Sequence, residues 1–379
     1  MSQQNMSYEG MSHPAHASPD ASGYEPEDEP QFAQTPHRIH GRGTAHNPPN
    51  RFVPIAYEPD PEEQETRVRT QLFRDAGRSI ITTNASPDIP FEASLNPYRG
   101  CEHGCAYCYA RPFHEYLGLS AGLDFETKLF VKEDAPELLR RELASPRWQP
   151  KLLVLSGVTD PYQPVERKLQ LTRACLKVLA AFRNPVSIIT KNHLATRDID
   201  LLAPLAREHA ASVYLSITTL DPELQRTLEP RAASPQRRLD AVRALSEAGI
   251  PTGVMVAPVI PGLTEPEIPA ILKAAAEAGA VRAGYIVLRL PHAVAPLFTR
   301  WLETHAPERR DKVLHRIEAL RGGRLNDPRF GSRMRGEGIF AREIEALFAL
   351  GRKQSGLSER SLELSTAAFR RPCQQLDLF

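Results

Sequence analysis

Residues 91–113 read FEASLNPYRGCEHGCAYCYARPF and place Cys101, Cys105 and Cys108 directly after an apolar stretch that predicts a β-strand. The spacing is CxxxCxxC, and Gly100 and Gly104 allow the backbone to wrap closely around a bound group. Three thiols on one short loop can converge on a single [4Fe-4S] cluster. A ferredoxin would normally add a fourth cysteine, so three ligands leave one iron open for another molecule.

Two other interpretations of these cysteines stay open at this point. Zinc could bind the three thiols together with His103 or His114, although structural zinc usually takes its ligands from two separated knuckles. The trio could also be unmetallated, but free thiols near solvent are prone to oxidation. A disulfide framework is disfavoured because the chain has five cysteines, an odd number, and no signal peptide is evident.

From about residue 86, short apolar runs alternate with segments of helical periodicity, which is typical of a βα repeat. The strand candidates are residues 91–98, 151–158, 185–190, 211–218, 251–260 and 283–290. The helix candidates between and after them are residues 169–182, 197–209, 234–249, 265–279 and 294–305. Nearly continuous apolar strands joined by helices indicate a parallel sheet, so we expect an α/β fold with a partial (β/α)6 TIM-like barrel. Its functional residues should lie at the C-terminal ends of the strands.

The composition divides the chain into four parts. Residues 1–66 are rich in Pro, Ser, His and acidic residues without apolar periodicity, so we expect a disordered N-terminal tail. Residues 67–85 are predicted to form a linker or a belt that docks on the core. Residues 86–307 form the predicted barrel, and residues 308–379 a helical C-terminal extension and tail.

The charge balance excludes a global attraction to nucleic acid, because 47 Lys and Arg face 46 Asp and Glu. Any such contact would have to be local, and the arginines of residues 321–338, RGGRLNDPRFGSRMRGEG, either contact phosphates or lie on a solvated face. No apolar run reaches the length of about 18 residues that a membrane span needs, so we expect a soluble cytoplasmic protein without membrane contact.

With Tyr107 directly before the third cysteine, the CxxxCxxC motif resembles the signature of the radical S-adenosylmethionine (SAM) superfamily. Residues of about 80 to 292 resemble a subgroup related to spore photoproduct lyase. The resemblance implies that Cys101, Cys105 and Cys108 hold a [4Fe-4S] cluster whose open iron binds the amino and carboxylate groups of SAM. It further implies reductive cleavage to methionine and a 5'-deoxyadenosyl radical, with electrons from an external donor such as flavodoxin or ferredoxin.

The same resemblance suggests SAM contacts at other strand ends. Thr159 and Asp160, in the stretch SGVTDPYQP, match a motif that touches the SAM amino group, and Lys191 matches a partner of the SAM carboxylate. Ser216 matches a hydroxyl near the ribose, and Tyr107 belongs to the cofactor-binding loop. Each has a plain structural alternative: Asp-Pro is ordinary turn chemistry, a strand-end lysine is often solvated, and an inward serine relieves crowding.

One departure limits the transfer of activity. Spore photoproduct lyases carry a hydrogen-donating cysteine near the second-strand motif, whereas residues 155–158 read LSGV. We therefore do not transfer thymine-dimer repair, and we expect an unknown substrate, with a nucleic-acid-related molecule as one hypothesis. The alternatives are an iron–sulfur electron-transfer module and a nucleic-acid-binding factor that uses the C-terminal extension. Glu229, Arg231, Arg237 and Arg238 are expected near the rim, without an assigned role.

Overall fold

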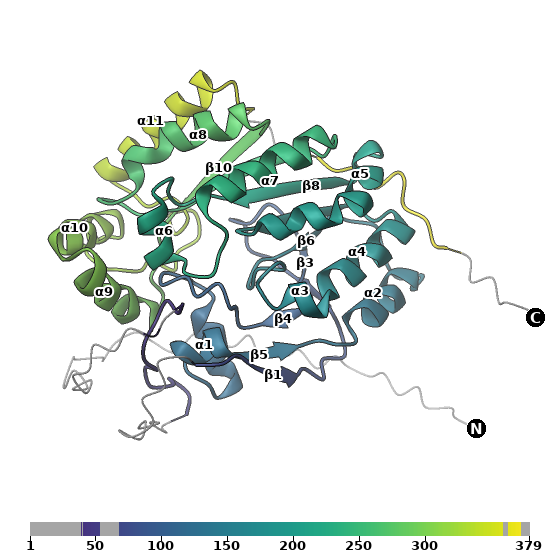
Figure 1. The fold of residues 1–379 in the computed structure, drawn as a ribbon, viewed down its shortest axis with the longest axis horizontal. Helices are drawn as coiled ribbons and strands as arrows, with labels where there is room; N and C mark the ends of the chain where they lie inside the picture. Colours follow the sequence, from purple (N-terminus) through teal and green to yellow (C-terminus); the bar gives the residue numbers. More distant parts are fainter. Residues whose placement is uncertain (1–38, 40, 54–67, 359–362, 373–379) are drawn as a thin grey trace, which may run out of the picture. The chain divides into compact units, whose positions relative to one another are not determined.

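A seven-stranded sheet lies at the centre of the fold (Figure 1). The structure is a computed structural model, and it describes Ile39 and residues 41–53, 68–358 and 363–372. Its strands lie in the order β10-β9-β8-β7-β6-β3-β2. From β3 to β10 all neighbours are parallel, and β2 runs antiparallel to β3. The strands are β2 (Ile81–Thr83), β3 (Ala93–Leu95), β6 (Leu153–Leu155), β7 (Val186–Thr190), β8 (Ala211–Ser216), β9 (Thr252–Val259) and β10 (Arg282–Val287). The six predicted strands and the parallel α/β fold are confirmed.

A second, three-stranded sheet was not predicted. It consists of β1 (Gln71–Arg74), β5 (Lys128–Val131) and β4 (Tyr98–Arg99), with β5 in the centre. β1 pairs with β5 in parallel, and β4 pairs with β5 antiparallel. The range 67–85, predicted as a linker or belt, therefore supplies one strand to each sheet. The four residues of β5 are too short a run for periodicity to identify.

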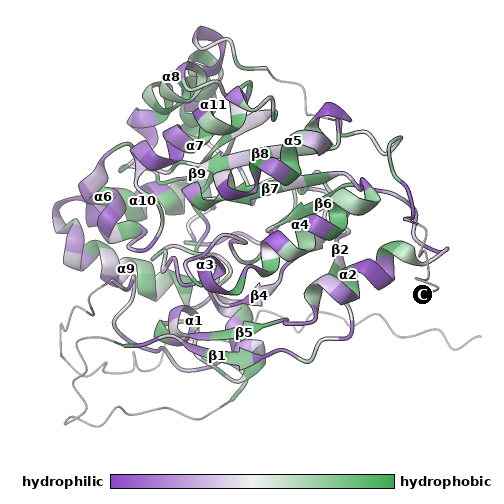
Figure 2. Ribbon diagram, turned by 45° about the vertical axis from the view of Figure 1, so that its right-hand side comes forward, coloured by the Kyte–Doolittle hydropathy of each residue, from purple (hydrophilic) through white to green (hydrophobic). Residues whose placement is uncertain are grey.

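Helices pack along the large sheet, and Figure 2 shows them with hydrophobic and hydrophilic residues interspersed along each helix. The α-helices are α1 (Leu123–Thr127), α2 (Ala135–Ala144), α3 (Glu166–Leu169), α4 (Leu171–Phe182), α5 (Ile199–Arg207), α6 (Pro222–Leu228), α7 (Pro235–Glu247), α8 (Ile268–Glu277), α9 (Val294–His305), α10 (Arg310–Leu320) and α11 (Ile339–Gln354). Short 3-10 helices are η1 (Arg111–Leu117), η2 (His193–Asp198), η3 (Glu265–Glu267) and η4 (Pro307–Arg309). Each predicted helix is confirmed within a few residues at its ends.

Local sequence explains these helix boundaries. Ser234 caps α7, since its side chain accepts a hydrogen bond from the Arg237 amide. Gly249 and Gly279 follow α7 and α8 with φ of 77° and 99°, the left-handed region that glycine enters without strain. Buried side chains of the strands, among them Leu155, Ile188, Leu215 and Val254, form the core between sheet and helices.

The loop at residues 321–338 spans from one sheet edge to the other. Met334 accepts a hydrogen bond of 2.9 Å from the Val287 amide in β10, while the Gly331 amide and the Arg333 side chain bind Asp88, between β2 and β3. Arg321 is buried and donates to several backbone carbonyls. For Arg321 and Arg333 the expectation of a solvated face is wrong, because these side chains make contacts within the chain. Phosphate contact by the arginines of this loop stays a prediction.

Residues 41–53 pack against the core, so the prediction of a disordered tail over residues 1–66 is wrong for this stretch. The Gly43 amide donates to Glu126 at 2.9 Å, and Asn47 and Asp124 exchange two hydrogen bonds of 3.0 and 2.8 Å. Single-sequence periodicity could not reveal this segment, because it is held by polar contacts rather than by apolar burial. The rest of the range, apart from Ile39, lies outside the described residues. No helix among the residues described is long and apolar enough to cross a membrane.

Candidate functional site

The cysteine loop follows β4 and is anchored on both sides. The Cys101 amide donates to the Phe125 carbonyl at 2.9 Å, and the Ala106 amide donates to the Leu228 carbonyl at 3.0 Å. Gly104 has a φ of 67°, and a Cβ there would lie 2.6 Å from a Glu126 carboxylate oxygen. The loop can therefore approach Glu126 closely only with glycine at this position.

The three thiols share one electrostatic environment. Burial raises the pKa of all three, and Cys105 and Cys108 raise that of Cys101 further because like charges repel. Lys191 opposes the effect of burial at both Cys105 and Cys108. The Asp160 amide also hydrogen-bonds Cys101 and lowers its pKa. Three mutually close thiols with cations and an amide donor around them suit an anionic, thiolate-bound cluster.

Both histidines of the zinc interpretation are engaged elsewhere. His103 has Nδ1 3.4 Å from Asp160 and Nε2 3.3 Å from Asn192, while His114 Nε2 lies 2.9 Å from the Lys128 carbonyl. Within the described part of the chain, no three His, Cys, Asp or Glu side chains are close enough to bind a single metal ion. Neither imidazole is therefore placed as a fourth ligand beside the three thiols, whereas a [4Fe-4S] cluster with one open iron needs only three protein ligands.

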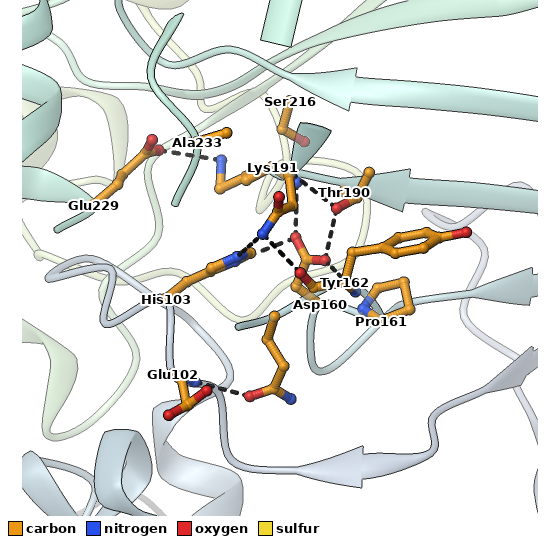
Figure 3. A network of polar contacts seen from close by, with 12 residues as sticks. Glu102, His103, Asp160, Pro161, Tyr162, Thr190, Lys191, Ser216, Glu229 and Ala233 are labelled. Carbon is orange, nitrogen blue, oxygen red and sulfur yellow. Dashed lines mark hydrogen bonds and ion pairs between the residues drawn. The ribbon is translucent and has the colours of Figure 1, made fainter. Parts of the chain in front are cut away.

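Asp160 connects three segments of the site (Figure 3). Its Oδ1 accepts hydrogen bonds from the Tyr162 amide at 2.9 Å and the Thr190 hydroxyl at 2.7 Å, and its Oδ2 accepts the Lys191 amide at 2.7 Å. His103 of the cysteine loop faces the same Oδ2. Burial alone would raise the pKa of Asp160, but His103 and these donors outweigh it and lower the pKa. Asp160 thus ties the ends of β6 and β7 to the cysteine loop.

Glu229 is fully buried and forms the centre of a second network, which includes Tyr107 of the cysteine loop. It pairs with Arg238, accepts hydrogen bonds from the hydroxyls of Tyr107 and Thr218, and lies 3.3 Å from the Lys191 ammonium group. Burial alone would raise the pKa of Glu229, yet Arg238 and Lys191 outweigh it and hold the pKa below its usual range. Glu229 therefore stays ionised and positions both Tyr107 and Lys191.

The remaining predicted residues also lie at these strand ends. Thr159 is buried, and its hydroxyl donates to the Tyr98 carbonyl at 3.0 Å. Ser216 ends β8, beside Lys191 at the end of the neighbouring β7, and its carbonyl accepts a hydrogen bond of 2.8 Å from Arg238. The structure thus gathers Asp160, Lys191 and Ser216 around the carboxyl ends of β6, β7 and β8 (Figure 3). Tyr107 joins them, because the Lys191 ammonium group lies 5.7 Å from the centroid of its ring.

Sequence reasoning missed the roles of Glu229 and Arg238. Both occur in the stretch LEPRAASPQRRLDA, residues 228–241, where several charged residues follow a strand. Arg238 is one of the largest fully buried side chains, whereas Arg237, its neighbour in sequence, lies outside this network. Only the helical position distinguishes the two, because Arg238 lies on the buried face of α7 with Leu239 and Val242.

Comparisons with known proteins find similarity to one superfamily. Residues 95–275 match the Radical SAM superfamily. A protein of Mycobacterium tuberculosis, named only as uncharacterized, is 40% identical over 222 residues, which are 58% of this chain and 65% of that protein. A Pseudomonas phage M6 protein named radical SAM Nalpha-GlyT isomerase is 29% identical over 214 residues, 56% of this chain and 42% of that protein. The chain thus spans less than two thirds of these relatives.

The fold also resembles that of a solved structure. Spore photoproduct lyase complexed with dinucleoside spore photoproduct has a TM-score of 0.52, with 76% of this chain and 80% of that chain covered. The two sequences are 18% identical, so this likeness concerns the fold alone.

Proposed function

We propose that this chain is a cytoplasmic enzyme that uses SAM for radical chemistry. The premise is its radical SAM domain over residues 95–275. Cys101, Cys105 and Cys108 would hold a [4Fe-4S] cluster. When bound, this cluster supplies an open iron for SAM and the electron that cleaves it to methionine and a 5'-deoxyadenosyl radical, which abstracts hydrogen from the substrate. An external donor such as flavodoxin or ferredoxin would supply the electron.

The observation that carries this proposal is the meeting of the three thiols with Lys191 and Asp160 at the carboxyl ends of parallel strands. Lys191 would bind the SAM carboxylate, since its ammonium group is mostly buried and held beside the cysteine loop by Glu229. Thr159 and Asp160 would lie nearest the SAM amino group. The Asp160 carboxylate already accepts three hydrogen bonds, so its main contribution is to fix that segment.

Reductive SAM cleavage tests the proposed function. The full chain, reconstituted anaerobically with iron and sulfide and reduced with dithionite, should convert SAM to methionine and 5'-deoxyadenosine, measured by liquid chromatography. Omitting the reductant should stop the conversion, because cleavage of the sulfonium requires an electron. A cluster that is reduced without any 5'-deoxyadenosine would favour the electron-transfer module instead.

Lys191→Ala should weaken SAM binding while the cluster still assembles. Loss of a charge-assisted hydrogen bond in a sheltered site costs about 1.5 to 3 kcal/mol, so the dissociation constant should rise about tenfold to hundredfold. Glu229 keeps Arg238 as its partner, which limits the damage to the fold. Calorimetric titration of SAM into variants of equal iron content measures the effect. Lys177→Ala, at an exposed position of α4, is the matched control, and equal affinities in all three proteins would remove Lys191 from the SAM site.

For the substrate we propose a nucleic-acid-related molecule. The solved structure with a similar fold is complexed with a dinucleoside, which supports this class only by analogy. The stretch of residues 155–158 has no thiol, so a hydrogen-donating cysteine at that place is not part of the proposal.

A further inference from the structure

Tyr109 and Arg289 meet beside the cysteine loop. Tyr109 directly follows Cys108, and its hydroxyl donates to the Gly157 carbonyl, just after β6, at 2.5 Å. Arg289 lies two residues beyond β10, and its guanidinium carbon is 5.8 Å from the centroid of the Tyr109 ring. Three strands separate β6 from β10 in the sheet. Tyr109 therefore reaches across the mouth of a curved sheet, where the cysteine loop also lies.

Arg289 has no anionic partner within the described part of the chain. Its Nε is buried and makes no hydrogen bond, and its Nη1 contacts only the weak acceptor Met334 Sδ, at 3.6 Å. No carboxylate of the residues described lies within ion-pair distance of it, whereas the nearby Arg333 pairs with Asp88. A sheltered guanidinium without an acceptor is unfavourable, so this geometry suits an incoming anion.

Exposed aromatic rings lie close to this arginine and to the neighbouring His292. Tyr109 is 43% exposed, and Phe330 is 61% exposed with the Arg333 guanidinium 4.5 Å from its ring centroid. Beyond β10, Arg51 lies close enough to His292 to lower its pKa, in addition to the larger effect of burial. Phe52, next to Arg51, stacks on the exposed Tyr116 with centroids 4.9 Å apart. One arginine with an aromatic neighbour, Arg333 with Phe330, thus lies near Arg289, and another, Arg51 with Phe52, lies near His292.

We propose that Arg289 binds a backbone phosphate and Tyr109 stacks on a base of a single-stranded nucleic-acid substrate. This inference rests on the proposed function, because the bound strand would be the substrate of that enzyme. Guanidinium groups pair with phosphate oxygens through two parallel hydrogen bonds, and any base has a π-face that can stack on an aromatic ring. A phosphate held at Arg289 would place the neighbouring nucleotide at the mouth beside the cysteine loop.

The distribution of charge and rings favours a strand over a small anion. The chain carries 47 Lys and Arg against 46 Asp and Glu, so binding has to come from a local site rather than from a general positive field. A small carboxylate would use Arg289 alone. The exposed rings of Phe330, near Arg289 through Arg333, and of Phe52 with Tyr116, near His292 through Arg51, offer further surfaces on which successive bases of one strand can stack.

Fluorescence anisotropy with the anaerobically reconstituted full chain tests the inference. The probe is a labelled oligothymidylate of about 12 nucleotides, within the usual size of such sites. Arg289→Gln should raise its dissociation constant about tenfold to hundredfold and reduce the slope of log affinity against log salt by about 0.7. Tyr109→Leu should weaken binding about tenfold, whereas Tyr109→Phe should retain most of the affinity because it keeps the ring.

Arg207→Gln is the matched control, because Arg207 is exposed at the end of α5, away from the strand ends that form the site. It should bind the probe like the wild type. Equal affinity and salt slope for Arg289→Gln and wild type would overturn the inference. So would a loss of SAM affinity in Arg289→Gln with unchanged probe binding, which would assign Arg289 to the SAM carboxylate. Probe binding needs no turnover, so SAM cleavage is measured separately in the same wild-type samples. Cleavage without probe binding would contradict this inference alone, and probe binding without cleavage would contradict the proposed function.

Discussion

Changing Cys101, Cys105 or Cys108 to Ala should remove most of the bound iron and abolish SAM cleavage. The wild type should be brown and contain about four irons per chain. The three thiols lie on one anchored loop, so the loss of any one leaves two ligands for a cluster that has no protein ligand to spare. Iron and sulfide analysis of anaerobically purified protein, together with the visible absorption spectrum, measures the effect.

Cys175→Ala is the internal control for these variants. Cys175 is fully buried in α4 within the hydrophobic core, on a different element from the cysteine loop. Its replacement should reduce stability by about 1 kcal/mol through lost packing, while iron content stays at the wild-type value. Equal loss of iron in Cys175→Ala would show that the ligands are wrongly assigned. One zinc per chain without iron or sulfide would contradict the cluster itself.

Arg238→Ala should destabilise the fold by about 3 to 5 kcal/mol. The substitution removes the principal partner of Glu229, which is fully buried and ionised, and Lys191 alone cannot replace it. Arg238 also donates hydrogen bonds to the carbonyls of Ser216 and Ala233, and both carbonyls would lose this donor in the variant. The midpoint of urea unfolding should be about 1 to 2 M lower for Arg238→Ala than for the wild type, with both proteins measured without the cluster.

Two further variants separate this buried pair from general effects on α7. Arg243→Ala removes an exposed arginine of the same helix, 3.9 Å from Asp240, and should change stability by less than about 1 kcal/mol. The double variant Arg238→Ala with Glu229→Gln should lose less than the sum of the single losses, because their interaction is removed only once. Additive losses, or equal effects of Arg238→Ala and Arg243→Ala, would contradict the role given to the pair.

The elements that could be predicted are those whose signals are local. The six parallel strands are apolar runs, and the helices between them carry their own starts and stops, such as Ser234 before α7 and Gly279 after α8. Burial on both sides makes such a strand apolar throughout, so composition alone marks it. The small sheet was missed because β1, β4 and β5 span only two to four residues each, which is too short for periodicity.

The cysteine loop, the order of parallel strands and helices, and the strand ends that carry the candidate site could all be predicted from the sequence, because spacing and periodicity are properties of neighbouring residues. Which charges are buried, and which groups they meet, follows from the packing of distant segments. Glu229 with Arg238, Arg333 with Asp88, and Gly43 with Glu126 are pairs that the fold brings together. A charged residue looks the same in sequence whether it is solvated or paired, and its partner is fixed by packing between distant segments.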